Sequence, residues 1–299
     1  MTPTVQAMDV RAVLREAMAR LRAANVPSHT LAAELLLMHV LERDRAWIYA
    51  HPDEAIGPAQ SAEYFELAAR RAAGTPTQYL TGKQEFWGLE FAVTRDVLIP
   101  RPETEHVVEV ALERMGKDSK DSPLGIADVG TGSGCLAVAL AREFPQARLL
   151  ATDISAAALA VARRNANRHD VTRRIEFAQC HLLDGFAASS LAARGSALDL
   201  IVSNPPYVRR GDAETLPREV REHEPPEALF AGAGGEELYP SLSEQAARLL
   251  RRGGVIVIEL GYNSEARVCP LFESGERWRK VSTTNDLAGI PRVLAAERR

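Results

Sequence analysis

The stretch that decides the fold of this chain is Ile126-Ala127-Asp128-Val129-Gly130-Thr131-Gly132-Ser133-Gly134, which runs from a predicted strand into a predicted helix. Glycine has no Cβ, so a glycine-rich turn bends sharply and lets a ligand approach the backbone closely. The spacing is GxGxG, whereas dinucleotide-binding turns carry GxGxxG and phosphate loops carry Gly-Lys followed by Ser or Thr. The turn therefore predicts a small-molecule site of a different kind.

Strands and helices alternate on both sides of this turn, from residue 124 to the end of the chain. The strands are expected at Gly125–Val129, Arg148–Thr152, Ile175–Ala178, Leu198–Ser203, Val255–Glu259, Lys280–Thr283 and Arg292–Ala296. The helices are expected at about Leu136–Glu143, Ser155–Arg168, Ser241–Arg251 and Ser264–Phe272. This pattern predicts an α/β fold, a doubly wound and mostly parallel seven-stranded sheet with helices on both faces. Ligands of such sheets bind at the carboxyl ends of the strands, where the glycine-rich turn lies.

The first part of the chain has a different period. Apolar residues recur at helical spacing from residue 9 to about residue 73, and Asn25-Val26-Pro27 interrupts the first helix. Thr30 is the predicted N-cap of an apolar helix, Leu31–Leu41. Shorter helices are expected at Arg45–Tyr49 and Pro58–Ala73, which makes a small helical bundle.

A segment with strand periodicity follows the bundle. Gln84–Ile99 alternates aromatic and β-branched residues, which predicts a β-hairpin with a turn near Thr94-Arg95-Asp96. Pro100 and Pro102 stiffen the exit from it. The sequence thus predicts a helical domain at 1–83, a hairpin linker at 84–102 and the α/β domain at 103–299.

Two aspartates accompany the glycine-rich turn. Asp153 ends the second predicted strand of the sheet, where a carboxylate can accept the hydroxyl protons of a ribose. Its alternative role is to cap the next helix, which Ser155 can do equally well. Asp128 has two open interpretations: it contacts the amino group of a cofactor, or it orders the turn.

The segment Asn204-Pro205-Pro206-Tyr207 leaves the carboxyl end of the strand Leu198–Ser203. An amide or aromatic amino nitrogen is a poor nucleophile because its lone pair is delocalised. The Asn204 side-chain oxygen and the Pro205 carbonyl can accept its two N–H groups, while Tyr207 offers a flat face for the planar group. If the nitrogen receives a methyl group from a donor that positively charged sulfur already activates, positioning of this kind can supply most of the catalysis. With the GxGxG turn, the segment predicts methyl transfer from S-adenosyl-L-methionine to a planar nitrogen, leaving S-adenosyl-L-homocysteine.

The bulk composition narrows the class of protein. Of 299 residues, 46% are apolar and 25% charged, and the formal net charge is −4, so no basic nucleic-acid surface is indicated. Cys135, Cys180 and Cys269 form no metal-binding spacing with any histidine, and we expect reduced thiols and no metal. With no long apolar stretch, the chain is expected to be cytoplasmic, without a membrane partner.

Together these motifs resemble one family closely. Residues 71–105, the turn at Gly130–Gly134, the segment Asn204–Tyr207 and the stretch Asn285–Ala295 are similar to peptide chain release factor glutamine methyltransferases, the PrmC or HemK family. The Pro-Arg-Pro-Glu-Thr-Glu run at 100–105 is more specific than Asn-Pro-Pro-Tyr, which adenine-N6 DNA methyltransferases share.

The resemblance implies a substrate and a set of contacts. The substrate would be the glutamine of the Gly-Gly-Gln loop of class 1 release factors, methylated on its side-chain nitrogen (N5) in the tuning of translation termination. The cofactor would lie along Gly130, Thr131, Gly132, Ser133 and Gly134, with its ribose at Asp153 and its reactive end near Asn204. The glutamine would bind at Asn204, Pro205, Pro206 and Tyr207, with Leu98 nearby. The helical domain would help to hold the release factor, and the enzyme is expected to be a monomer without nucleic acid.

The chain departs from the family pattern at two places. After the third strand of the sheet, His181 stands where relatives carry an aspartate near the adenine, and Leu182 is expected to cover the adenine face. The adenine contact then comes from His181, from the main chain or from Asp184; alternatively His181 is a surface residue. Asn263 stands where relatives often carry glutamine, and nothing in the sequence explains this difference.

Two other functions compete with glutamine methylation. A flipped adenine could occupy the same pocket, but duplex binding needs a basic recognition surface and no target-recognition domain is evident. A cofactor-binding module without catalysis need not keep both Asn204 and Tyr207. Protein-glutamine methylation is therefore the favoured prediction.

Overall fold

The computed structural model describes residues 8–193, 195, 197–274 and 276–299, and these form two compact units. The first unit runs to Lys83 and also includes Pro217–His223. The second unit comprises Gln84–Leu216 and Glu224–Arg299. The segment Pro217–His223 is thus separated by more than a hundred residues of chain from the rest of its unit, which the sequence pattern did not indicate.

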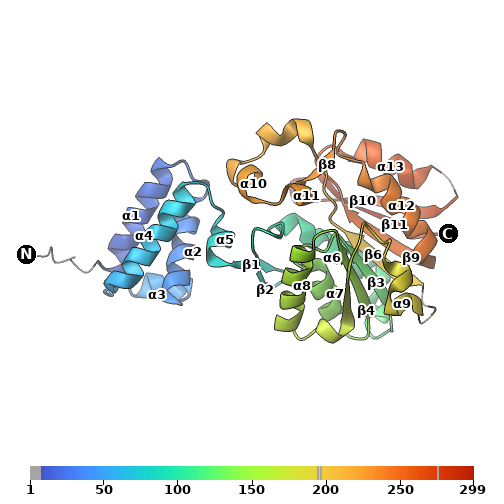
Figure 1. The fold of residues 1–299 in the computed structure, drawn as a ribbon, viewed down its shortest axis with the longest axis horizontal. Helices are drawn as coiled ribbons and strands as arrows, with labels where there is room; N and C mark the ends of the chain where they lie inside the picture. The colour runs from blue at the N-terminus through green and yellow to red at the C-terminus, as the bar shows by residue number, and fades with distance from the viewer. Residues whose placement is uncertain (1–7, 194, 196, 275) are drawn as a thin grey trace, which may run out of the picture. The chain divides into compact units, whose positions relative to one another are not determined.

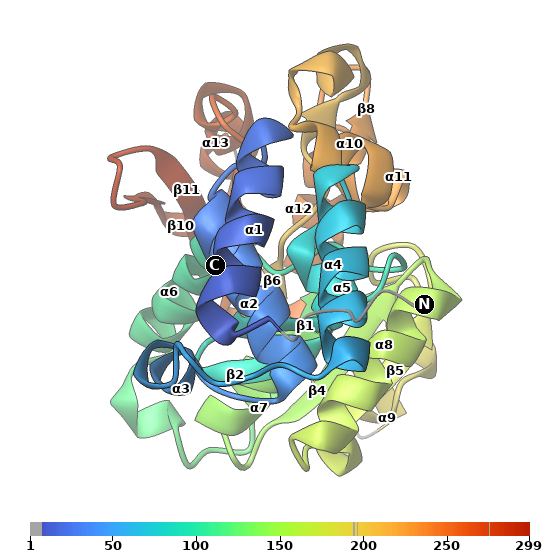
Figure 2. The ribbon, with the colours of Figure 1, turned by 90° about the vertical axis from the view of Figure 1, so that its left-hand side faces the viewer.

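The first unit is a small helical bundle in which α1, α2 and α4 pack against one another (Figures 1 and 2). Leu21, Leu36, Leu37 and Tyr64 are fully buried in its core. The Tyr64 hydroxyl donates to the carbonyl of Ala33 at 3.1 Å, so the one polar atom of this ring is satisfied. The helices of the unit are α1 (Val10–Ala23), α2 (His29–Leu41), α3 (Arg45–Ala50), α4 (Pro58–Ala72), α5 (Thr77–Thr81) and α10 (Arg218–His223).

The start of α2 differs from the prediction. Ser28, and not Thr30, is the N-cap residue, and it has a left-handed backbone without a side-chain capping bond. The Ala32 N–H already donates to the Ser28 carbonyl at 3.0 Å, so Thr30 lies inside the first turn. The prediction was wrong because the backbone leaves the Asn25–Pro27 turn directly into the helix.

The hairpin consists of β1 (Lys83–Phe86) and β2 (Leu89–Ala92). Its turn is at Trp87 and Gly88, with φ of 55° and 68°, and not near Thr94–Asp96 as predicted. Two successive residues of positive φ match the right-handed twist of a two-residue hairpin, and Gly88 adopts this conformation freely. The residues Thr94 to Val97 form a separate turn, closed by a bond from the Val97 N–H to the Thr94 carbonyl.

The second unit contains a seven-stranded sheet of order β10-β11-β9-β6-β3-β4-β5. The pairs from β9 through β5 are parallel, whereas β11 is antiparallel to both of its neighbours. The order reverses between β3 and β6, so the carboxyl ends of these strands border a crevice. The predicted doubly wound, mostly parallel seven-stranded fold is confirmed. The strands are β3 (Gly125–Val129), β4 (Arg148–Asp153), β5 (Ile175–Gln179), β6 (Leu198–Ser203), β9 (Leu250–Glu259), β10 (Trp278–Asn285) and β11 (Pro291–Arg298).

Alternate residues of the central strands face opposite sides of the sheet. Ile126 and Leu200 join a cluster with α6, α7 and α8, whereas Ala127 and Ile201 join a cluster with α12 and α13. Helices therefore cover both faces of the sheet (Figure 1). These helices are α6 (Glu105–Met115), α7 (Cys135–Glu143), α8 (Ala156–Arg168), α9 (Ser190–Ala193), α12 (Leu238–Leu249) and α13 (Glu265–Glu273).

Short elements after β6 complete the unit, and the 3-10 helix Pro102–Thr104 precedes α6. The strands β7 (Val208–Arg209) and β8 (Phe230–Gly232) pair in parallel, and α11 spans Pro226–Leu229. Within the described ranges, no helix is both long and apolar enough to cross a bilayer.

Candidate active site

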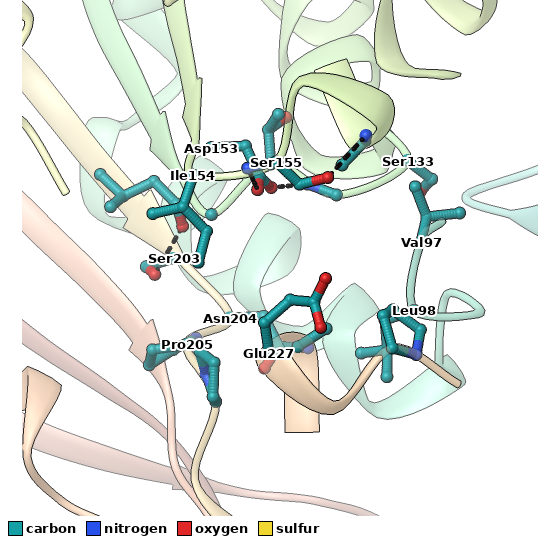
Figure 3. Close-up of a pocket in the computed structure, with 18 of the residues that line it drawn as sticks. Val97, Leu98, Ser133, Asp153, Ile154, Ser155, Ser203, Asn204, Pro205 and Glu227 are labelled. Atoms are coloured by element: carbon teal, nitrogen blue, oxygen red, sulfur yellow. Dashed lines mark hydrogen bonds between the residues drawn. The ribbon is translucent and has the colours of Figure 1, made fainter. Parts of the chain in front are cut away.

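A cavity lies at the carboxyl ends of β3, β4, β5 and β6, within the second unit (Figure 3). It brings together residues that were predicted from five separate stretches of sequence. Of the predicted site residues, it is lined by Leu98, Gly130, Thr131, Gly132, Ser133, Asp153, His181, Leu182, Asn204, Pro205 and Pro206. The topology explains the convergence, because parallel strands bring their carboxyl ends to one edge of the sheet.

The glycine-rich turn requires its glycines for two different reasons. Gly132 has a φ of 53°, which side-chain-bearing residues rarely adopt. Gly134 has a φ of 82°, and a Cβ there would lie 3.1 Å from Cα of Ala162 in α8. Glycine at 134 therefore allows α7 and α8 to pack closely beside the cavity.

Asp128 lies beneath this turn and is fully buried. Its Oδ2 accepts from the Thr131 hydroxyl at 2.6 Å and from the Ala137 N–H at 3.0 Å. Burial raises the pKa of Asp128 to about 7, against the lowering effect of these two bonds. Asp128 is not among the residues that line the cavity, so the geometry supports the interpretation that it orders the turn.

Asp153 lies at the edge of the cavity with both carboxylate oxygens engaged by backbone. Oδ2 accepts from the Gly132 N–H and Oδ1 from the Ser155 N–H, both at 2.9 Å. Ser155 caps α8, since its hydroxyl oxygen accepts from the Ala158 N–H at 3.1 Å. Asp153 is thus free of the capping role, and each of its oxygens keeps a lone pair for a ligand. Burial raises the pKa of Asp153, while the backbone N–H groups lower it.

His181 and Leu182 both line the cavity. Leu182 is buried with a φ of 47°, whereas the His181 side chain is half exposed. The alternative that Asp184 reaches back into the cavity is not what the structure shows. Its Oδ1 accepts from Gln245 at 2.9 Å, Oδ2 lies 3.8 Å from Nδ1 of His181, and Asp184 is not a lining residue.

Asn204 is held by a chain of side-chain hydrogen bonds. Its Nδ2 donates to Oγ1 of Thr104 at 3.0 Å, and the Thr104 hydroxyl donates to Oε2 of Glu259 at 2.6 Å. The other Glu259 oxygen accepts from the Tyr207 hydroxyl at 3.3 Å. Burial raises the pKa of Glu259 to about 7, against the lowering effect of the Thr104 and Tyr207 hydroxyls and of Arg292.

Tyr207, whose ring is predicted to offer a flat face to the acceptor, is held by two contacts of its own. It does not line the cavity that contains Asn204. The ring packs against Gly261, where a Cβ would come within 2.9 Å of it, and its hydroxyl is directed to the buried Glu259. The buried carboxylate of Glu259 thus fixes the hydroxyl end of the ring.

The sequence pattern did not indicate several residues of the site. Thr104 and Glu259 are 155 residues apart, so their contact has no local pattern. Ile154 lines the cavity with 51% of its surface exposed, and an apolar residue directly after Asp153 was a readable signal. Glu227 reaches into the cavity from α11 (Figure 3). Glu224 lies shortly before Glu227 in the chain. Its carboxylate accepts from the Ile99 N–H and from Arg101, which connects the segment around α11 to the predicted linker.

Two family models match the chain. Residues 12–82 match the PrmC N-terminal domain, and residues 109–220 match the methyltransferase small domain. The release factor glutamine methyltransferase of Koribacter versatilis is 40% identical over 97% of this chain and 99% of its own length. That of Chlorobaculum tepidum is 42% identical over 98% of both chains.

The chain belongs to the release factor glutamine methyltransferase family. The resemblance predicted from residues 71–105, the glycine-rich turn and Asn204–Tyr207 is therefore confirmed. Among solved structures, the hMettl16 catalytic domain, in complex with an RNA hairpin, has a TM-score of 0.56 and 19% identity over 78% of this chain and 82% of its own. That likeness shows that the family's α/β methyltransferase fold is present here.

Proposed function

We propose that this enzyme transfers a methyl group from S-adenosyl-L-methionine to the side-chain nitrogen (N5) of the glutamine in the Gly-Gly-Gln loop of class 1 release factors. The observation that carries the proposal is the hydrogen-bonded placement of Asn204 in the same cavity as the glycine-rich turn and Asp153. Family membership supplies the substrate class, because its relatives carry the name release factor glutamine methyltransferase.

The cavity residues fit an adenosyl sulfonium donor. Asp153 keeps lone pairs on both oxygens, which suits the two hydroxyls of a ribose. Ile154 and Leu182 offer apolar surface on which an adenine ring can lie, with His181 at its edge. Asp96, Asp153 and Glu227 also line the cavity, and this acidic lining favours a cationic ligand.

Asn204 and Pro205 are the proposed positioning acceptors for the glutamine amide. The Asn204 Oδ1 and the Pro205 carbonyl accept its two N–H groups and direct the nitrogen lone pair. The donor supplies a methyl group on positively charged sulfur. A bond forms between nitrogen and the methyl carbon as the carbon–sulfur bond breaks, its electron pair goes to sulfur, and one N–H proton leaves to solvent. Positioning of this kind needs no strong general base.

The remaining assignments follow from family membership and the shape of the cavity. Leu98 and Pro206 line the cavity and would contact the glutamine or its loop, and Tyr207 would act through Glu259. The first unit would bind the body of the release factor. We propose a cytoplasmic, monomeric enzyme that acts on protein and does not bind nucleic acid or membranes.

Labelled methyl transfer tests this proposal directly. Purified enzyme is incubated with methyl-labelled S-adenosyl-L-methionine and a release factor, its Gly-Gly-Ala variant or duplex DNA. We expect label only on the release factor with intact Gly-Gly-Gln, and none with the Asn204→Ala enzyme. Labelling of DNA alone would replace the proposal by adenine methylation, and equal labelling of the Gly-Gly-Ala variant would exclude the glutamine.

A further inference from the structure

Thr104 connects two residues that are otherwise separate, Asn204 at the cavity and Glu259 at the end of β9. It accepts from Asn204 Nδ2 at 3.0 Å and donates to Glu259 at 2.6 Å. Thr104 is 2% exposed and Glu259 is 1% exposed, so water does not compete for these bonds. The three side chains form a directed chain of hydrogen bonds.

The direction of this chain follows from counting hydrogens. Above about pH 7 Glu259 is ionised and can only accept, and a threonine hydroxyl carries one hydrogen. When that hydrogen is given to Glu259, the Thr104 oxygen can only accept from Asn204. The amide nitrogen of Asn204 is then the atom that faces Thr104, and Oδ1 is the atom left for a ligand.

The orientation of this amide decides how an acceptor glutamine binds. Oδ1 accepts an N–H, which keeps the glutamine nitrogen beside Asn204. If the amide turned over, its NH₂ group would instead bind the glutamine carbonyl, and the nucleophilic nitrogen would point away. Both orientations can bind a glutamine, but only one presents the nitrogen for transfer.

We infer that Glu259 and Thr104 are positioning residues that fix the Asn204 amide with Oδ1 toward the acceptor. This rests on the proposed function, since it concerns the nitrogen that is methylated. It also gives the Pro-Arg-Pro-Glu-Thr-Glu run a chemical role. The 3-10 helix Pro102–Thr104 delivers the hydroxyl to a point between β6 and β9, which are neighbours in the sheet.

Thr104→Val and Thr104→Ser are the matched pair of variants. Valine keeps the shape without the hydroxyl, and serine keeps the hydroxyl. With labelled donor and release factor at pH 8, where Glu259 is ionised, we expect Thr104→Val to lower kcat about 10- to 100-fold. Its KM values and its affinity for S-adenosyl-L-methionine should stay within about threefold of wild type, and Thr104→Ser should retain kcat within about threefold. A kcat for Thr104→Val equal to wild type, or one for Thr104→Ser as low as for Thr104→Val, would overturn the inference.

Glu259→Gln provides an independent test, also in the event that Thr104→Val does not fold. The glutamine side chain can donate to Thr104 as well as accept from it, so both amide orientations become available and kcat should fall about two- to tenfold. The double variant Thr104→Val/Glu259→Gln should be no slower than Thr104→Val, because both changes act through Asn204. An unchanged kcat in Glu259→Gln, or effects that multiply in the double variant, would contradict the inference. Failure of the wild-type enzyme to label the release factor would refute the proposed function itself, which separates the two failures.

Discussion

Asp128 and Glu259 are two fully buried carboxylates at the carboxyl ends of strands in one sheet, and burial raises the pKa of each to about 7. Their partners differ. Asp128 binds Thr131 and Ala137, three and nine residues away, and so braces the cofactor turn locally. Glu259 binds Tyr207 and Thr104, 52 and 155 residues away, and so braces the acceptor side across the fold. The glycine-rich turn on the donor side is thus braced from within its own segment, whereas the acceptor side is braced by residues that are distant in the sequence.

The largest effect should come from removing the acceptor group itself. We expect Asn204→Ala to lower kcat for methyl transfer by about 10³-fold or more, because the glutamine nitrogen loses its orienting acceptor. The dissociation constant for S-adenosyl-L-methionine, measured by calorimetry, should stay within about threefold. A loss of cofactor affinity above about tenfold would show that Asn204 contributes to binding of the donor as well as of the acceptor.

This division also explains what could be predicted from the sequence. The glycine spacing, Asp153 and the Asn204–Tyr207 segment each lie within a few residues at one strand end, so local pattern indicated them. The sheet was predicted because its strands are buried apolar runs separated by amphipathic helices. The role of Thr104 was not predicted, because its partners come from β9 and from the loop after β6.

The local errors have physical causes as well. The hairpin turn was misplaced because Trp87 adopts a positive φ, which the sequence pattern assigns to glycine, asparagine or aspartate. The bond from the Tyr207 hydroxyl to Glu259, 52 residues away, was not predicted either. Spacing along the chain does not report such long-range donors.

On the donor side we expect a smaller effect, and it should fall on cofactor affinity and not on kcat. Asp153→Ala should weaken binding of S-adenosyl-L-methionine about 100-fold, because it removes charged acceptors for two ribose hydroxyls. At saturating cofactor, kcat should remain within about fivefold of wild type. Isothermal titration and steady-state kinetics give the two numbers separately. Unchanged affinity would contradict the assignment of Asp153 to the ribose. A loss of kcat as large as the loss of affinity would show that Asp153 also acts on the acceptor side.

The smallest effect concerns stability, and it tests whether the two carboxylates are energetically alike despite their different partners. A carboxyl whose folded pKa is raised binds its proton more tightly in the folded state, so stability rises as pH falls through the folded pKa toward the unfolded one. As the pH falls from about 8 to about 5, protonation of each group should increase the free energy of unfolding by on the order of 2 kcal/mol. Denaturant titrations at the two pH values measure this gain. In Asp128→Asn and in Glu259→Gln the gain should be smaller than in wild type by that amount, because an amide does not titrate. Glu297→Gln is the matched control, since ion pairing with Lys280 and Arg279 lowers the pKa of Glu297 and its stabilisation is lost only below this window. If one buried variant kept the full pH dependence, that carboxyl would be ionised throughout, and its hydrogen bonds would outweigh its burial.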